Sequence, residues 1–142
     1  MEAVMIRKLA LEDLEEVMSI WLQTNLETHD FIEANYWRDN FDVVKEVLPQ
    51  AEVYVDEEDG KIRGFIGITQ GYIAGVFVSG DYQAQGIGSQ LLDKAKTLYP
   101  SLTLSVYAKN DRAVSFYLRK GFKIIKEQKD ESTNEQEYVM QY

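Results

Sequence analysis

Apolar residues in the first third of the chain recur at helical spacing. Between residues 11 and about 25 they appear every three or four positions, which predicts an amphipathic helix. A second helix is predicted from about Ile32 to Leu48. Pro49 ends it, because the residue before a proline is disfavoured in the α region. The polar joint between these helices, residues 24–32, contains His29, the single histidine of the chain.

The pattern in the middle of the chain changes to that of β-strands. Short apolar runs at residues 52–55 and 62–68 flank the pair Asp59-Gly60. This pair predicts a tight hairpin, because both central residues of a type I′ turn need positive φ. Residues 72–78 follow directly and complete an antiparallel meander. They are apolar or small at nearly every position, which predicts a strand covered on both faces. Residues 5–9 are a further short strand candidate.

The last third alternates between helices and strands. A helix that opens at Gly86 and Gly88, includes Ile87 on its apolar side and stops before Pro100 is predicted, and a strand at residues 102–107 follows it. Because this strand returns after a helical crossover, we expect it to lie parallel to residues 72–78. The next helix is predicted to begin at a cap, Asn110 or Asp111, and to end at Lys120-Gly121.

Two final strands are predicted at residues 122–125 and 138–140. The charged stretch between them, residues 127–137, is interpreted as a turn.

Composition and charge narrow the classes of protein that fit this pattern. The 142 residues are 45% hydrophobic, which predicts one globular domain spanning residues 1–142. The net charge of −9 argues against nucleic acid as a partner and favours a cationic small molecule or a basic protein segment; acidity that serves only solubility is the alternative interpretation. The chain has no cysteine, which excludes thiolate metal sites and favours a reducing cytoplasm; no metal is expected. No apolar run reaches about 18 residues and no signal peptide is recognisable, so no membrane partner is expected.

A strand, a loop and two glycines that open a helix form the most informative stretch, residues 76–92. A glycine-rich entry to a helix leaves backbone N–H groups pointing outward at the positive end of the helix dipole, which favours a phosphate or pyrophosphate. The dinucleotide fingerprint fails here, because its third glycine position is Leu91. The P-loop fails as well, because no Gly-Lys-Ser/Thr follows. A purely structural helix start is the alternative interpretation.

Two motifs in order support the functional interpretation. Gln83-x-x-Gly86-x-Gly88 is followed about twenty residues later by Asn110-x-x-Ala113-x-x-Phe116-Tyr117-x-x-x-Gly121-Phe122. At these residues the chain resembles the GCN5-related N-acetyltransferase (GNAT) family, most of all its small single-domain bacterial members. The resemblance implies an α/β (α+β) fold in which about four helices flank a mixed, mostly antiparallel sheet of six or seven strands. It also implies that the first motif cradles the pyrophosphate of acetyl-coenzyme A (acetyl-CoA).

The resemblance also implies which residues meet the coenzyme. The pantetheine arm would enter a wedge between two central strands, where Phe77–Val78 faces Leu104–Tyr107. A backbone N–H near Val78 would polarise the thioester carbonyl. Asn110 and Tyr117 are seven residues apart and project from one helical face, whereas Phe116 points away from them and is better interpreted as core. The full implied set is Phe77, Val78, Gln83, Ala84, Gln85, Gly86, Ile87, Gly88, Ser89, Asn110, Ala113, Phe116 and Tyr117.

The implied reaction is direct transfer of the acetyl group to a primary amine, without a nucleophilic residue. The resemblance places Tyr117 as the general acid that protonates the leaving thiolate; a packed aromatic is its alternative role. His29 and Glu33 are four residues apart at the start of the second predicted helix, where they are expected to share a face, and are candidates for a catalytic base or for lining an acceptor pocket.

The acceptor is left open among a small amine, a polyamine and a protein lysine. Three aromatic residues would wall its pocket or belong to the core: Phe31, Tyr36 and Trp37. A non-catalytic acetyl-CoA sensor and an interaction module are the rival functions, and a homodimer is compatible with either.

Overall fold

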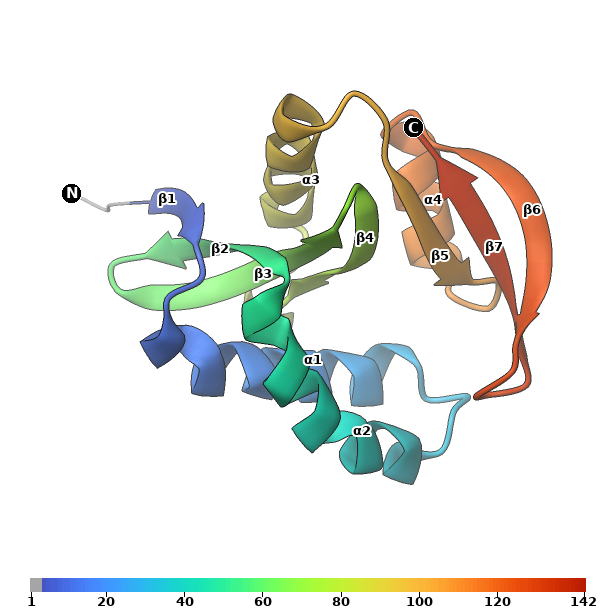
Figure 1. Cartoon of the computed structure of the whole chain (residues 1–142), viewed down its shortest axis with the longest axis horizontal. Helices are drawn as coiled ribbons and strands as arrows, with labels where there is room; N and C mark the ends of the chain where they lie inside the picture. The colour runs from blue at the N-terminus through green and yellow to red at the C-terminus, as the bar shows by residue number, and fades with distance from the viewer. Residues whose placement is uncertain (1–3) are drawn as a thin grey trace.

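The computed structural model describes residues 4–142, and these form one seven-stranded sheet with helices on both faces (Figure 1). Within the described chain the strand order is β1-β2-β3-β4-β5-β7-β6, and every neighbouring pair is antiparallel except β4 and β5. The strands are β1 Val4–Lys8, β2 Glu52–Glu58, β3 Lys61–Thr69, β4 Tyr72–Val78, β5 Thr103–Tyr107, β6 Lys123–Asp130 and β7 Glu135–Gln141. The predicted fold class is confirmed.

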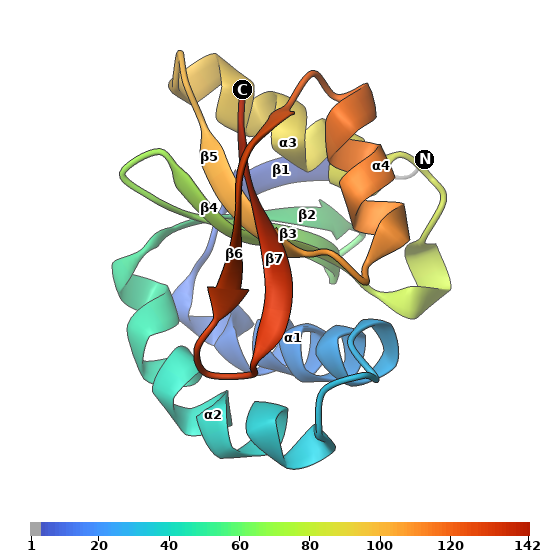
Figure 2. The same ribbon diagram turned by 90° about the vertical axis from the view of Figure 1, so that its right-hand side faces the viewer.

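The helices divide into two pairs. α1 (Leu14–Thr28) and α2 (Ala34–Val47) cover one face of the sheet, while α3 (Ile87–Leu98) and α4 (Asp111–Arg119) lie on the other (Figure 2). Three short 3-10 helices complete the described elements: η1 Leu11–Asp13, η2 Leu48–Gln50 and η3 Gly80–Tyr82.

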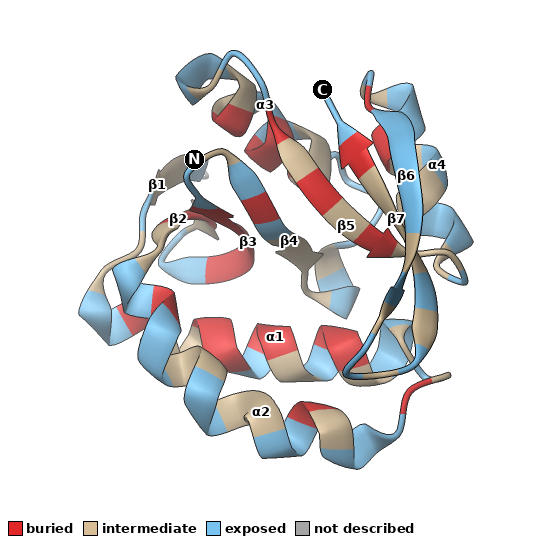
Figure 3. Cartoon of the chain, turned by 45° about the vertical axis from the view of Figure 1, so that its right-hand side comes forward, coloured by how far each residue is buried: buried red, intermediate tan, exposed pale blue. Residues whose placement is uncertain are grey.

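The core has two halves because successive residues of a strand point to opposite faces. On β3, Phe65 packs with Val17 and Trp21 under α1 and α2. Its neighbour Ile66 packs with Leu91 of α3 on the other face. Figure 3 shows the buried positions of α1 turned toward the sheet. The apolar stripe of α1 and both faces of β3 are therefore buried, whereas Leu11, which precedes α1, is exposed.

The hairpin between β2 and β3 follows the sequence prediction. Asp59 and Gly60 have φ of +51° and +82°, as both central residues of a type I′ turn require. Gly121 has φ +95° just beyond the end of α4, which is the left-handed conformation expected at that position.

The joint between the first two helices differs from the prediction. α1 continues to Thr28, and His29 is its C-terminal cap with φ −109° and ψ 49°. α2 begins at Ala34, so Glu33 is its N-terminal cap. The prediction that His29 and Glu33 share a face at the start of the second helix is therefore wrong, since a turn separates them.

The interpretation of residues 127–137 as a charged turn is also wrong. β6 continues to Asp130 and β7 begins at Glu135, so the turn covers residues 131–134. The charges are compatible with strands because β6 lies at the edge of the sheet, where most of its side chains are exposed.

The strand at residues 72–78 is not covered on both faces as predicted. Of the seven described residues of β4, Ile73 alone is buried. Among the described residues the parallel ladder to β5 contains two pairs, Tyr72–Thr103 and Ile73–Leu104. The two strands then diverge, and no ladder pair of the described chain joins the second half of β4 to β5. The splayed strands that the resemblance implied are thus present.

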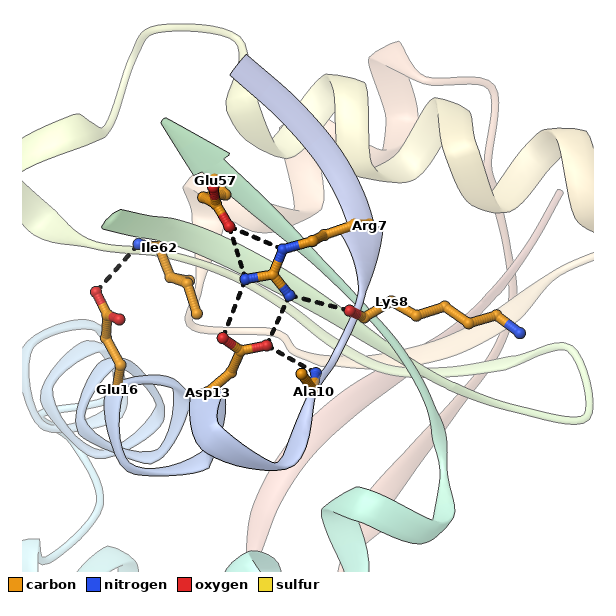
Figure 4. A network of polar contacts seen from close by, with 7 residues as sticks. All are labelled: Arg7, Lys8, Ala10, Asp13, Glu16, Glu57 and Ile62. Carbon is orange, nitrogen blue, oxygen red and sulfur yellow. Dashed lines mark hydrogen bonds and ion pairs between the residues drawn. The ribbon is translucent and has the colours of Figure 1, made fainter. Parts of the chain in front are cut away.

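A network of ion pairs joins β1 to the start of the helical layer (Figure 4). The guanidinium of Arg7 donates to both carboxylate oxygens of Asp13, at 2.7 and 3.0 Å, and to Glu57 Oε1 of β2 at 2.8 Å. Asp13 Oδ2 also accepts the backbone N–H of Ala10 at 2.7 Å. The hydrogen bonds from Arg7 hold the pKa of Asp13 below its usual range.

We expect Asp13→Asn to lower the free energy of unfolding by about 1–2 kcal/mol at pH 7, because it removes a charge-assisted pair. The pKa of Asp13 is lowered in the folded state, so the stabilisation is present above about pH 4 and is lost as the pH falls through the folded pKa. Urea titrations at pH 7 and pH 3 measure this difference. A loss of equal size at both pH values would contradict the assignment, and Glu12→Gln, at the exposed neighbour, is the control.

Candidate active site

Two cavities in the described part of the chain meet at the side chain of Tyr117. The first has a volume of about 460 Å³ and lies between the end of β4, the start of α3 and α4. The second has a volume of about 290 Å³ and lies between α1, the diverging strands β4 and β5, and the β6–β7 hairpin. Four residues border both cavities: Val76, Asn110, Ala113 and Tyr117. Tyr117 and Asn110 thus stand at the passage between them.

The loop before α3 shapes the floor of the first cavity. Gly86 is the N-terminal cap of α3 and has φ +80°, a conformation that favours glycine. Gln83 Nε2 donates to the carbonyl oxygen of Val78 at 3.1 Å, which ties the loop to the end of β4. A Cβ on Gly88 would lie 3.7 Å from Val76, Val78 and Phe116, so it would stand among the side chains that wall the cavity. The loop therefore presents the start of α3 to open space.

The backbone of Val78 points into the gap between the diverging strands. Ser79 N donates to Arg63 O of β3 at 2.8 Å. Because hydrogen bonding alternates along an antiparallel pair, Phe77 and Ser79 face β3, and the N–H of Val78 faces the side of β5. This N–H is the backbone donor for which the family resemblance implies a role beside the thioester carbonyl.

α4 carries the two motif residues at the passage. Asn110 caps this helix, because its Oδ1 accepts the backbone N–H of Ala113 at 3.2 Å. Tyr117 is 7% exposed, and its ring centroid lies 5.2 Å from that of Phe116 and 5.6 Å from that of Phe122. Burial raises the pKa of Tyr117 well above its ordinary value, so the phenol is protonated at neutral pH.

Two arginines of α4 border the first cavity and were missed in the sequence. Arg112 and Arg119 are seven residues apart, so they lie on one helical face, and the same spacing that paired Asn110 with Tyr117 indicates them. Guanidinium groups suit phosphate oxygens because their donors match them in pairs. The first cavity thus combines a glycine-rich helix start with two cations.

Aromatic rings and two carboxylates line the second cavity. Tyr107 Oη donates to Asp130 Oδ2 at 2.7 Å, and burial raises the pKa of Tyr107. Glu137 Oε2 accepts from Gln128 Nε2 at 2.6 Å. The sequence reasoning missed Asp130 and Glu137 because it interpreted their segment as a turn. The aromatic residues of this wall are Trp21, Trp37, Tyr72, Phe77 and Tyr107.

The imidazole of His29 lies at the inner wall of the second cavity. Its Nδ1 is 2.9 Å from Asn25 Oδ1, and its Nε2 is 3.2 Å from Asn110 Nδ2. Burial lowers the pKa of His29 to about 4. Glu33 is exposed and lies outside both cavities. The two residues proposed for the acceptor side are therefore not brought together.

The coenzyme residues expected from the sequence divide among three places. Phe77 borders the second cavity, and Gln85 is exposed and lies outside both. Phe116 is half-buried, packs against the core beside α3 and α4 as expected, and also borders the first cavity. The others border the first cavity: Val78, Gln83, Ala84, Gly86, Ile87, Gly88, Ser89, Asn110, Ala113, Phe116 and Tyr117.

The three aromatic residues expected to wall the acceptor pocket or to belong to the core lie in different places. Trp37 is buried and borders the second cavity, whereas Phe31 and Tyr36 are half-buried against the core under α1 and α2. Residues 4–142 contain no group of three histidine or acidic side chains arranged to hold a metal ion. The described helices include none that is long and apolar enough to span a bilayer.

Comparisons with known proteins match this arrangement. The family model described as "Acetyltransferase (GNAT) domain" matches residues 22–136. Peptidyl-lysine N-acetyltransferase YiaC of Escherichia coli K12 is 39% identical over 123 residues, 85% of this chain and 84% of that protein. Peptidyl-lysine N-acetyltransferase YjaB of the same strain is 33% identical over 123 residues, 85% of this chain and 83% of that protein. The solution structure of apo YjaB superposes with a TM-score of 0.87, at 29% identity, over 99% of this chain and 97% of that one.

Proposed function

The chain belongs to the GNAT acetyltransferase family, and we propose that it transfers the acetyl group of acetyl-CoA to the side-chain amine of a protein lysine. The observation that carries this proposal is the position of Tyr117 at the meeting point of two cavities of different chemistry. One cavity suits a phosphorylated coenzyme and the other suits a cationic amine. The peptidyl-lysine activity named for YiaC and YjaB favours lysine over other amines. The cysteine-free sequence favours a reducing cytoplasm as the place of action.

We assign the first cavity to acetyl-CoA. The backbone N–H groups at the start of α3 and the positive end of its dipole would bind the pyrophosphate. Arg112 and Arg119 would pair with further phosphate oxygens. The amide groups of the pantetheine arm would take the place of the missing ladder between β4 and β5, beyond Ile73. A pantetheine arm bound between these strands would place the thioester near Tyr117.

Residues of β4 and α4 would assist the chemical step. The amine attacks the thioester carbon, and the N–H of Val78 stabilises the negative charge that develops on the carbonyl oxygen. As the C–S bond breaks, the hydroxyl of Tyr117 gives its proton to the leaving sulfur, and the proton that the amine nitrogen loses as the amide forms restores the phenol. The burial that raises the pKa of the phenol also destabilises a bare thiolate beside it, so the pKa values of donor and acceptor shift in the same direction.

We assign the second cavity to the lysine side chain. Its aromatic walls would contact the aliphatic part of the side chain, and Asp130 and Glu137 would attract the ammonium group. Neutralising a lysine amine at pH 7 costs roughly 4–5 kcal/mol, so the rate of acetylation should rise with pH as the free amine increases.

The test measures release of free coenzyme A thiol with a blocked peptide that contains one lysine. Acetylation of that lysine, seen as the mass of one added acetyl group, would support the proposal, and the same peptide with arginine in its place should not react. Turnover of polyamines or small amines alone would refute the lysine assignment. Binding of acetyl-CoA without thiol release on any of these amines would indicate the sensor instead.

Gly88→Ala tests the coenzyme assignment separately. The new methyl group would meet its neighbours at 3.7 Å, an ordinary contact, so the melting temperature should change little. Because it stands among the cavity walls, we expect KM for acetyl-CoA to rise about tenfold. Gly86→Ala is the matched contrast, since its strain at φ +80° should lower stability by about 1 kcal/mol. An unchanged KM for Gly88→Ala would argue against the assignment.

A further inference from the structure

The ring of His29 bridges two helices that are far apart in the sequence. Nδ1 contacts Asn25 of α1, and Nε2 contacts Asn110, the N-terminal cap of α4, 81 residues away. The contact between α1 and the start of α4 therefore passes through this imidazole.

Backbone partners fix the orientation of both asparagine side chains. Asn110 Oδ1 is taken by the N–H of Ala113, so its Nδ2 faces His29 and donates to Nε2. Asn25 Nδ2 donates to the carbonyl oxygen of Trp21 at 2.9 Å, so its Oδ1 faces His29 and accepts from Nδ1. The network is therefore consistent with one neutral tautomer, in which Nδ1 carries the proton and the lone pair of Nε2 accepts the hydrogen bond from Asn110.

The surroundings of the ring favour this neutral form. Ring centroids of Tyr107, Trp37 and Phe31 lie 5.1, 5.5 and 5.7 Å from that of His29. Asp130 and Glu137 border the same cavity and their charges favour the protonated form, but burial outweighs them and lowers the pKa of His29. A protonated ring would turn an N–H donor toward the amide donor of Asn110 and break the bridge.

We propose that His29 is a positioning residue whose neutral imidazole holds Asn110, and through it the start of α4, so that Tyr117 stands between the two cavities. The inference rests on the proposed function, in which Tyr117 is the general acid. It differs from a general-base role for His29, because a base would need the Nε2 lone pair that Asn110 occupies.

Two amide substitutions at position 29 distinguish a positioning role of His29 from a role as catalytic base. In His29→Gln the longer side chain places an amide oxygen near the former Nε2, where it accepts from Asn110. In His29→Asn the shorter amide reaches the former Nδ1 and leaves Asn110 without a partner. We expect His29→Asn to lower kcat by roughly tenfold and His29→Gln by no more than about threefold, with KM for acetyl-CoA nearly unchanged in both.

The pH profile is the second readout. Both variants should keep the shape of the wild-type profile of kcat/KM, because no titrating base is lost. If both variants lost kcat equally, and the decrease of kcat/KM at low pH seen in the wild type disappeared in both, His29 would be a base. Wild-type kcat in both, or a lower kcat for His29→Gln than for His29→Asn, would equally overturn the proposal. Thermal melts of both variants verify folding.

Nitrogen-15 NMR of the wild-type ring tests the bridge without any activity measurement. The sequence contains one histidine, so the imidazole signals need no assignment by mutation. We expect a neutral ring protonated at Nδ1 throughout pH 5–8. A proton on Nε2, or a titration near the ordinary pKa of about 6.5, would overturn the proposal. If wild-type protein acetylated no amine at all, the proposed function would fail while this spectrum still decided the tautomer.

Discussion

Replacing Tyr117 by phenylalanine is expected to lower kcat by about 10²- to 10³-fold, since positioned proton donors contribute factors of that size. The ring contacts with Phe116 and Phe122 do not involve the hydroxyl and would be kept. KM for acetyl-CoA should therefore change by less than about twofold. The measurement is initial-rate thiol release with saturating acceptor.

Tyr82→Phe is the matched control for this substitution. Tyr82 borders the first cavity but lies away from the passage to the second, so its hydroxyl should contribute nothing to kcat. Equal kcat values for Tyr117→Phe and the wild type would remove Tyr117 from the mechanism. The alternative role of a packed aromatic would then stand.

The pH dependence of kcat follows from the same burial. A general acid acts in its protonated form, so activity is lost as the pH rises through its pKa. Burial raises that pKa above the ordinary value near 10, so kcat should show no alkaline loss below about pH 10. An alkaline limb in kcat between pH 7 and 9 that disappears in Tyr117→Phe would contradict the high pKa.

Neutralising both carboxylates of the second cavity should produce the next largest effect. We expect the double variant Asp130→Asn and Glu137→Gln to raise KM for a lysine acceptor by roughly 30- to 100-fold, because the ammonium group loses both of its charged partners. Asn at position 130 can still accept from Tyr107, and Gln at position 137 can still accept from Gln128, so the hairpin should fold.

Glu131→Gln provides the control for charge alone. Glu131 is exposed in the turn of the same hairpin and lies outside both cavities, so removing its charge should leave KM unchanged. A double variant with wild-type KM for lysine peptides would show that the ammonium binds elsewhere. KM for acetyl-CoA in the same assays separates an acceptor defect from a general loss of structure.

The local structure around the first cavity follows from the sequence because the signals there are local. A positive φ at Gly86 and the capping of α4 by Asn110 depend on residues within a few positions, and the structure has both. The acceptor side was harder because its residues come from α1, β4, β5 and the β6–β7 hairpin. Asp130 and Glu137 lie on strands whose charged residues resemble those of a turn until their place at the sheet edge is known.

Helix boundaries explain the error over His29 and Glu33. The predicted joint at residues 24–32 included His29, but the first helix was expected to end near residue 25, whereas it continues to Thr28 and the chain leaves it only at His29. That departure accompanies the hydrogen bond to Asn110 and the aromatic contacts with Tyr107 and Trp37, which involve residues distant in the sequence. Tertiary contacts overrode the local pattern.

β4 and β5 are paired at Tyr72–Thr103 and Ile73–Leu104. Beyond these pairs, each of the two strands has an unpaired edge that faces the other within the sheet. An open strand edge on a protein surface invites pairing with other chains, and most proteins must cover it. Here the unpaired segments beyond Ile73 lie inside the sheet and border the two cavities, and under the proposed function the amide groups of the pantetheine arm would pair with them. Under that proposal the fold would offer strand-like recognition to a small molecule at an edge that lies within the sheet and not at its rim.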